Sequence, residues 1–321
     1  MEIIENTGSS GVFILKVDED DVNTILLNTD IDENGILQYA YENFADEFSG
    51  NILEYAFVYA DIDVPRNQVT RKQREAARSL MKLHEVQTLR KYLENDVPES
   101  QWDKKFLTWY KRKGVFGEII LHMLLKEFKN TIPLISKMYF KDSFSQEAKG
   151  FDAVHVSEDG STLWLGETKF YTNWESSDKV PGGIEELVGD LKKHFIKDYF
   201  NEQFVVIRRG LESQYNHPQR EKWLERLSKA IVLKDVFQYI RIPLLCIYED
   251  GLASQYLKAV DDAVKNSAIV KHTTTVRDYY DSLNDAPYKA QMQTLLILMP
   301  IEAKNKLIKY MLEKIWHMQN I

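Results

Sequence analysis

Two acidic residues and a lysine lie near the ends of one short stretch of the chain, GFDAVHVSEDGSTLWLGETKFY (150–171). Asp152 stands close to its start, and Glu167 and Lys169 stand close to its end. Carboxylates are the ligands that Mg²⁺ prefers in proteins, and a lysine beside the metal can stabilise negative charge on a reacting phosphate. These residue types would suit the hydrolysis of a phosphodiester, provided that the fold brings them together.

The sequence between the two acids predicts a β-hairpin that would do so. Asp159-Gly160 is typical of a two-residue type I′ turn, in which both turn residues need a positive φ. With that turn, residues whose numbers sum to 319 lie opposite one another, so Asp152 faces Glu167. Side chains alternate along a strand, which puts Lys169 on the same face as both acids. Since like charges at such short range destabilise a sheet, we expect a cation between the carboxylates.

A third acid is available on a predicted helix that precedes the hairpin. Glu118 lies in the run GVFGEIILHMLL (114–125), where most of its helical neighbours are apolar, and an acid in such surroundings usually has a partner. We therefore expect Asp152 and Glu167 to bind Mg²⁺ or Mn²⁺, and Glu118 to be a further ligand directly or through water. Lys169 would position the attacking water and stabilise charge.

The pattern of an acid, one residue and then lysine is weak evidence by itself, because the chain repeats it at five other places: Asp103/Lys105, Glu127/Lys129, Glu147/Lys149, Asp190/Lys192 and Glu302/Lys304. Only Glu167/Lys169 is predicted to lie on a central strand opposite a second acid. The alternative is a structural cluster of salt bridges at the edge of the sheet, in which the acids and the lysine neutralise one another.

The surrounding sequence predicts an α/β architecture with a mixed sheet flanked by helices. Besides the hairpin, strands are expected at 11–17, 53–64, 134–140, 242–249 and 293–300. Helices are expected at 69–93, 101–130, 184–200, 218–229, 254–266 and after the last strand. A break at 95–100 divides the chain into an N-terminal α+β extension, residues 1–100, and a main domain, residues 101–321. The extension is a possible partner-binding region.

The charge distribution is uneven along the chain. The net charge of −8 argues mildly against non-specific binding of nucleic acid over the whole surface of the protein. Residues 1–63 hold fifteen acids and one lysine, whereas residues 66–113 are rich in lysine and arginine, which indicates separate partners for the two segments or a solvated helix surface. A single cysteine, with no long apolar stretch and no signal peptide in the sequence, predicts a cytoplasmic protein.

The motifs resemble those of the PD-(D/E)xK nuclease superfamily. FGEII (116–120) resembles its acid on the first helix, GFDAV (150–154) its Asp at the second strand and GETKF (166–170) its (D/E)xK on the third, although Phe151 replaces the motif's proline. More narrowly, roughly residues 100–320 resemble the HamA nuclease family of Hachiman antiphage defence. That resemblance implies a restriction-endonuclease-like core and a Mg²⁺-dependent, DNA-degrading effector held by a partner helicase, HamB.

Two other functions stay open from the residues alone. The chain could be a catalytically silent adaptor that binds a helicase or nucleic acid, with the acidic cluster as a relic. It could also be an RNase built on the same scaffold. Cleavage assays with DNA and RNA would separate these alternatives.

Overall fold

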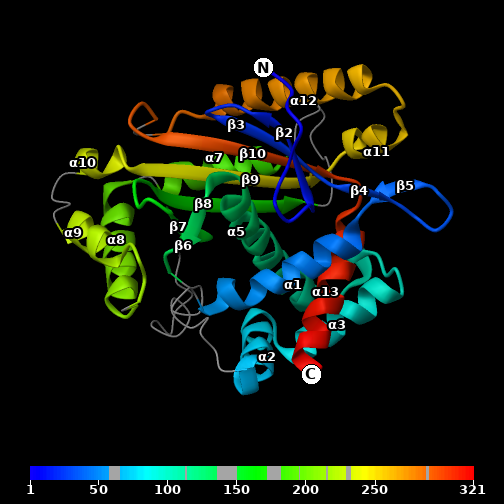
Figure 1. Ribbon diagram of the computed structural model, residues 1–321, viewed down its shortest axis with the longest axis horizontal. Helices are drawn as coiled ribbons and strands as arrows, with labels where there is room; N and C mark the ends of the chain where they lie inside the picture. Colours follow the sequence, from blue (N-terminus) through cyan, green and yellow to red (C-terminus); the bar gives the residue numbers. More distant parts are fainter. Residues whose placement is uncertain are drawn as a thin grey trace.

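An eight-stranded mixed sheet runs through the computed structural model of the chain (Figure 1). In spatial order its strands are β1 (Asn6–Thr7), β2 (Phe13–Asp18), β3 (Val22–Leu27), β10 (Gln293–Ile301), β9 (Ile240–Glu249), β8 (Leu163–Tyr171), β7 (Ala153–Ser157) and β6 (Thr131–Pro133). Strands β3, β10, β9 and β8 are parallel to one another, and the remaining pairs are antiparallel. The structure describes residues 1–57, 66–112, 114–135, 150–171, 182–194, 196–214, 216–228, 233–286 and 289–321.

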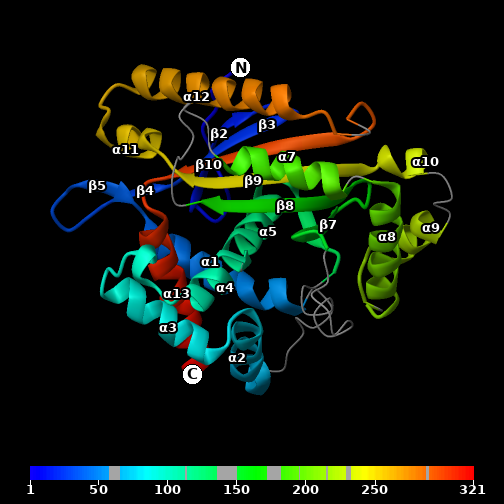
Figure 2. The same cartoon turned by 180° about the vertical axis from the view of Figure 1, so that it is seen from behind.

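Helices cover both faces of this sheet. One face, to which Leu245 and Ile247 of β9 contribute, packs against α1 (Tyr41–Phe57), α2 (Val69–Leu80), α3 (Leu83–Glu94), α4 (Lys104–Arg112), α5 (Val115–Lys129) and α13 (Lys304–Asn320). The other face, with Leu244 and Cys246, packs against α7 (Gly183–His194), α8 (Lys197–Glu212), α9 (Arg220–Ser228), α10 (Leu233–Phe237) and α12 (Asp262–Leu283). Seen from behind, Figure 2 shows α7 and α12 on one side of the sheet and α1, α5 and α13 on the other.

Smaller elements connect these layers. Strands β4 (Thr29–Ile31) and β5 (Leu37–Tyr39) form a separate two-stranded sheet, and α11 (Gly251–Lys258) follows β9. Two short 3₁₀ turns are η2 (Arg66–Gln68) and η3 (Glu99–Gln101). None of the described helices combines the length and the apolar character that a membrane crossing requires.

The sheet is shared by the first and last parts of the chain. Val22–Thr24 of β3 pair with Leu296–Leu298 of β10, so strands from the first 27 residues extend the sheet of the later ones. Helix α1 also packs against α5 and α13. The sheet therefore crosses the boundary predicted at residue 100, and the division into two domains stays a prediction.

Most predicted elements of the α/β architecture are confirmed. Strands predicted at 11–17, 242–249 and 293–300 are β2, β9 and β10, and the hairpin is β7–β8. The helix predicted at 69–93 is interrupted at Met81 and Lys82, and those at 101–130, 184–200 and 254–266 each fall on two helices. Two helices extend beyond the predicted ranges: α8 continues to Glu212 and α12 continues to Leu283.

The strand predicted at 53–64 is wrong where the structure describes it. Residues 53–57 are the last turns of α1, and residues 58–64 lie outside the described part. The buried residues Tyr41, Phe44, Phe48, Ile52 and Tyr55 recur every three or four positions, which is the spacing of a helix face. Strand β6 covers Thr131–Pro133, just before the strand predicted at 134–140, of which residues 136–140 lie outside the described part.

Candidate active site

The hairpin β7–β8 has the predicted register. Ala153 pairs with Gly166, Val154 with Leu165 and Val156 with Leu163. The turn itself differs from the prediction, because only Gly160 of the Asp-Gly pair has a positive φ, at 67°. The Ser157 amide donates to the Thr162 carbonyl at 2.9 Å, and residues 158–161 form the loop. Because the longer loop adds one residue to each side, the pairing is unchanged.

Asp152 lies one residue before β7, in contact with β8. Its amide donates to the Gly166 carbonyl at 2.8 Å, and its Oδ2 accepts hydrogen bonds from the Thr168 amide at 2.9 Å and the Thr168 hydroxyl at 3.1 Å. The expected direct pairing of Asp152 with Glu167 is therefore wrong in detail, since the ladder ends at Ala153 and Gly166. The Asp152 carboxylate binds the Thr168 amide in place of a strand carbonyl, which fixes this acid at the end of the hairpin.

Glu167 and Lys169 lie on the face of β8 that packs against α7. Their odd-numbered neighbours Leu163 and Leu165 belong to the apolar core of that face, and Glu167 itself is only 4% exposed. Lys169 Nζ lies 2.7 Å from Asp190 Oδ2 of α7. Burial acts to lower the pKa of Lys169, but the hydrogen bond and charge of Asp190, with the charges of Asp152 and Glu167, outweigh it and raise that pKa. Lys169 is therefore a firmly protonated cation.

Glu118 approaches from α5, on the opposite face of the sheet. The helix lies close to β8 because residue 117 is glycine; a Cβ there would be 3.1 Å from Thr168 Oγ1. The Tyr55 hydroxyl of α1 donates a hydrogen bond to Glu118 Oε2. Burial, followed by the charges of Glu118 and Asp152, raises the pKa of Tyr55 well above its usual value. Tyr55 thus lies within electrostatic reach of both acids.

The structure therefore places all four predicted site residues around the start of β7 and the end of β8. Asp152 acts electrostatically on Lys169 from one side and on Tyr55 from the other. Tyr199 of α8 also lies within electrostatic reach of this cluster, since burial and then the charges of Glu167 and Asp152 raise the pKa of Tyr199. Asp152 lies between Glu118 on the α5 face and the pair of Glu167 and Lys169 on the α7 face.

Sequence reasoning missed Asp190 and Tyr55. Asp190 borders the apolar stripe of the helix predicted at 184–200, next to Leu191 and one turn from Leu187, and an acid at that border could have been noticed. Tyr55 fell in a segment predicted as a strand, so no signal connected it with Glu118.

The donor set is chemically suited to Mg²⁺. Among the described residues, no group of three or more His, Cys, Asp or Glu side chains is arranged to hold a metal. Mg²⁺ usually keeps several waters and is bound by one or two carboxylates together with substrate phosphates. Two hard oxygen donors, Asp152 and Glu167, at one end of the hairpin fit that mode without a third ligand.

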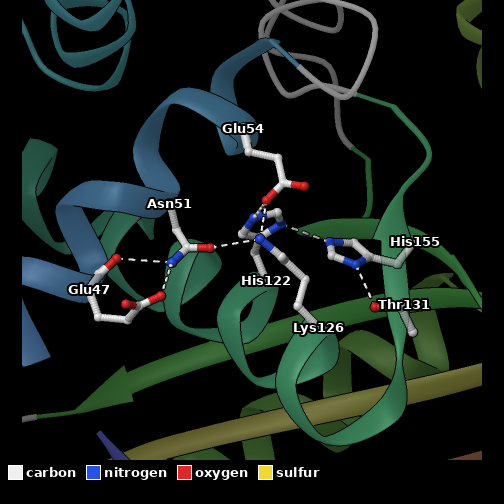
Figure 3. A network of polar contacts seen from close by, with 7 residues as sticks. All are labelled: Glu47, Asn51, Glu54, His122, Lys126, Thr131 and His155. Atoms are coloured by element: carbon white, nitrogen blue, oxygen red, sulfur yellow. Dashed lines mark hydrogen bonds and ion pairs between the residues drawn. The ribbon is translucent and has the colours of Figure 1, made fainter. Parts of the chain in front are cut away.

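A buried polar network connects the elements that carry these acids (Figure 3). Thr131 Oγ1 of β6 lies 2.8 Å from His155 Nδ1, and His155 Nε2 lies 3.0 Å from His122 Nδ1 of α5. His122 Nε2 is 3.4 Å from Glu54 Oε2 of α1, and Lys126 Nζ also bonds to Glu54. Burial lowers the pKa of both histidines, so both are neutral near pH 7. The network ties α1, α5, β7 and β6 together behind the site.

The comparisons with known proteins identify the family. No sequence among the curated proteins matches the chain. The HamA family, by contrast, matches residues 9–315, which is nearly the whole chain. This protein therefore belongs to the HamA family of Hachiman defence proteins.

Proposed function

We propose that this HamA-family chain is a metal-dependent nuclease that hydrolyses phosphodiester bonds in DNA. The observation that carries the proposal is the convergence of Asp152, Glu167 and Lys169 at one end of the hairpin, with Lys169 held by Asp190. The order α5, β6, β7, β8, α7 and then β9 is also compatible with the helix, three strands, helix and strand expected for a PD-(D/E)xK core, although α8, α9 and α10 lie between α7 and β9.

The chemistry follows from the donor types. A bound Mg²⁺ or Mn²⁺ would supply Lewis-acid polarisation of the phosphate and a more acidic water. Asp152 and Glu167 would hold the ion, while the two hydrogen bonds from Thr168 keep the Asp152 carboxylate in one orientation. Lys169, whose raised pKa keeps it protonated, cannot be a general base; it would orient the attacking water and stabilise the developing negative charge. Glu118 would be a further ligand directly or through water.

The charges around Lys169 show that this end of the hairpin attracts a cation. Three acids, Asp152, Glu167 and Asp190, act to keep Lys169 protonated. Asp190 pairs with Lys169 at 2.7 Å and with the largely exposed Lys193 at 3.4 Å. A divalent ion held by Asp152 and Glu167 would add positive charge where these acids favour it.

We further propose that the chain works as the effector of a Hachiman complex with DNA and a HamB-like helicase as partners. Family membership supports the defence context. The acidic first segment and the basic segment that follows suit two different surfaces, one for a protein and one for DNA phosphates.

The proposal is tested by plasmid cleavage with the purified chain in Mg²⁺ or Mn²⁺. We expect Glu167→Ala and Lys169→Ala each to abolish cleavage while the circular dichroism spectrum and helicase binding stay as in the wild type. Lys192→Ala, in the acid-x-lysine pattern Asp190/Lys192, is the matched control and should cut normally, because Lys192 is exposed and pairs with Asp285. A wild-type chain that cuts neither DNA nor RNA would favour the adaptor, and one that cuts only RNA would favour the RNase.

A further inference from the structure

We propose that Tyr55 of α1 is a positioning residue of the candidate site, whose hydroxyl sets the Glu118 carboxylate beside Asp152. This inference rests on the proposed nuclease function and deepens it. It assigns part of the site to residues 1–100, which the sequence indicated only as an extension that binds a partner.

The first observation is the bond between Tyr55 and Glu118. The Tyr55 hydroxyl donates to Glu118 Oε2, and the tyrosine side chain is buried, at 7% exposure. A hydrogen bond to a charged acceptor in a buried setting is stronger than one between neutral groups. It therefore restricts the carboxylate to a narrow range of orientations.

The second observation places Tyr55 next to Asp152 as well. Tyr55 and Asp152 both line one cavity of about 20 Å³, whose other lining residues include His122 and His155. That is room for about one water molecule, and the lining offers it polar partners. Tyr55 therefore contacts Glu118 directly and shares a water-sized cavity with Asp152.

The third observation is that the end of α1 is itself fixed. Glu54, the residue before Tyr55, bonds to Lys126 and lies near His122, and Lys126 Nζ also reaches Asn51 Oδ1 at 3.0 Å. The Tyr55 ring packs edge-on against His122 with centroids 5.9 Å apart. A hydroxyl on such a restrained helix end can orient an acid at little cost in conformational entropy.

Removal of this hydroxyl should weaken the site without dismantling it. Partners that orient metal ligands typically change metal affinity about 10–100-fold when they are mutated. A purely structural tyrosine would instead change stability and leave the metal requirement as it was. The metal dependence is therefore the measurement that separates the two roles.

The experiment compares Tyr55→Phe with Tyr41→Phe in the full chain. Tyr41 is matched because it lies on the same helix, is 2% exposed and donates to another glutamate, Glu302, at 3.2 Å. It is also about 20 Å away along the helix axis. Binding of Mn²⁺ alone is measured by calorimetry, and plasmid cleavage is titrated with Mg²⁺.

We expect Tyr55→Phe to weaken Mn²⁺ binding and to raise the Mg²⁺ midpoint of cleavage by about tenfold or more, with a smaller loss of rate at saturating Mg²⁺. Tyr41→Phe should match the wild type in both. In a Glu118→Ala background, Tyr55→Phe should add no further effect, because the carboxylate that the hydroxyl positions is already absent.

Two outcomes would overturn the role of Tyr55 in different ways. A wild-type chain that binds Mn²⁺ and cuts DNA, beside a Tyr55→Phe chain with the same midpoint, would refute only the positioning role. A wild-type chain that neither binds Mn²⁺ nor cuts would remove the nuclease function and this inference together.

Discussion

Lys169 of β8 and Asp190 of α7 form an ion pair in which Nζ lies 2.7 Å from Oδ2. The pair joins the lysine of the predicted motif to a helix that the motif does not include. Asp190, together with the charges of Asp152 and Glu167, outweighs the effect of burial and raises the pKa of Lys169, so this acid helps to keep the lysine charged and in place. The function of Lys169 should therefore depend on Asp190.

We expect Asp190→Asn to reduce DNA cleavage by about tenfold or more at pH 8. Without the Asp190 carboxylate the pKa of Lys169 should be lower than in the wild type, so cleavage should also decline at a lower alkaline pH. The measurement is the cleavage rate from pH 7 to pH 10. Asp285→Asn is the control. It removes the exposed partner of Lys192, a lysine that lies on α7 like Asp190, and should leave the pH profile unchanged. Equal profiles for Asp190→Asn and wild type would show that Asp190 does not act through Lys169.

Gly166→Ala should destabilise the protein by about 1–3 kcal/mol through overpacking. A Cβ at Gly166 would lie 2.5 Å from Leu121 Cδ2 and 3.3 Å from both Ala153 Cβ and Pro243 Cγ. Gly189→Ala in α7 is the control, because a Cβ there has no atom within 4 Å, and it should stabilise the helix by up to about 1 kcal/mol. Urea denaturation gives both values. A neutral Gly166→Ala would show that α5 does not pack closely on β8.

Acid should destabilise the fold through its buried histidines. Burial lowers the folded-state pKa of His122 and His155, while Glu54 opposes the shift on His122 and Lys126 adds to the shift on both. Below about pH 6.5 the unfolded chain takes up protons on these histidines and the folded chain does not, so the free energy of unfolding falls. The pKa of Glu54 is held at about 2, so this acid stays ionised throughout.

The check is the melting temperature at pH 7.5 and at pH 5.5. It should fall between these values in the wild type, and the fall should be smaller in His155→Gln. His317→Gln, at a histidine that is 70% exposed, should keep the wild-type dependence. His217 and His272 also have pKa values lowered by burial, so part of the dependence remains in every variant. An identical fall in His155→Gln would exclude His155 as a contributor.

Residues 101–321 alone should not fold into a soluble domain. Deletion of residues 1–100 would expose the edge of β10 that pairs with β3. It would also expose the face of α13 that packs on α1, α2 and α3. An unpaired apolar edge strand promotes aggregation. Gel filtration and circular dichroism of the fragment give the answer, and a monomeric, folded fragment would support the predicted division at residue 100.

Local signals in the sequence predicted the elements around the hairpin well. The Asp-Gly pair gave the register of β7 and β8 even though its turn type was wrong, because symmetric lengthening of a loop preserves the pairing. Strands β9 and β10 are long, apolar runs that suit buried parallel strands. In contrast, β3 (VNTILL) follows a run of acids, Asp18–Asp21, which concealed a short buried strand.

Contacts between distant segments could not be predicted in the same way. Tyr55 and Glu118 are 63 residues apart, and their contact depends on how α1 packs on α5. Asp190 pairs with Lys169 only because α7 packs against β8, and the sequence does not predict that packing. A motif identifies which side chains could do chemistry, whereas the partners that orient them depend on tertiary packing.

The pairing of β3 with β10 has a consequence for biosynthesis. A ribosome releases β1, β2, β3 and α1 first, but the strand that joins them to the sheet and the helix that supports α1 are translated last. Until then, the helix that bears Tyr55 lacks α13 beneath it. Under the proposed function, the site around Tyr55 and Glu118 would therefore stay incomplete until the last strand and the last helix of the chain have been synthesised.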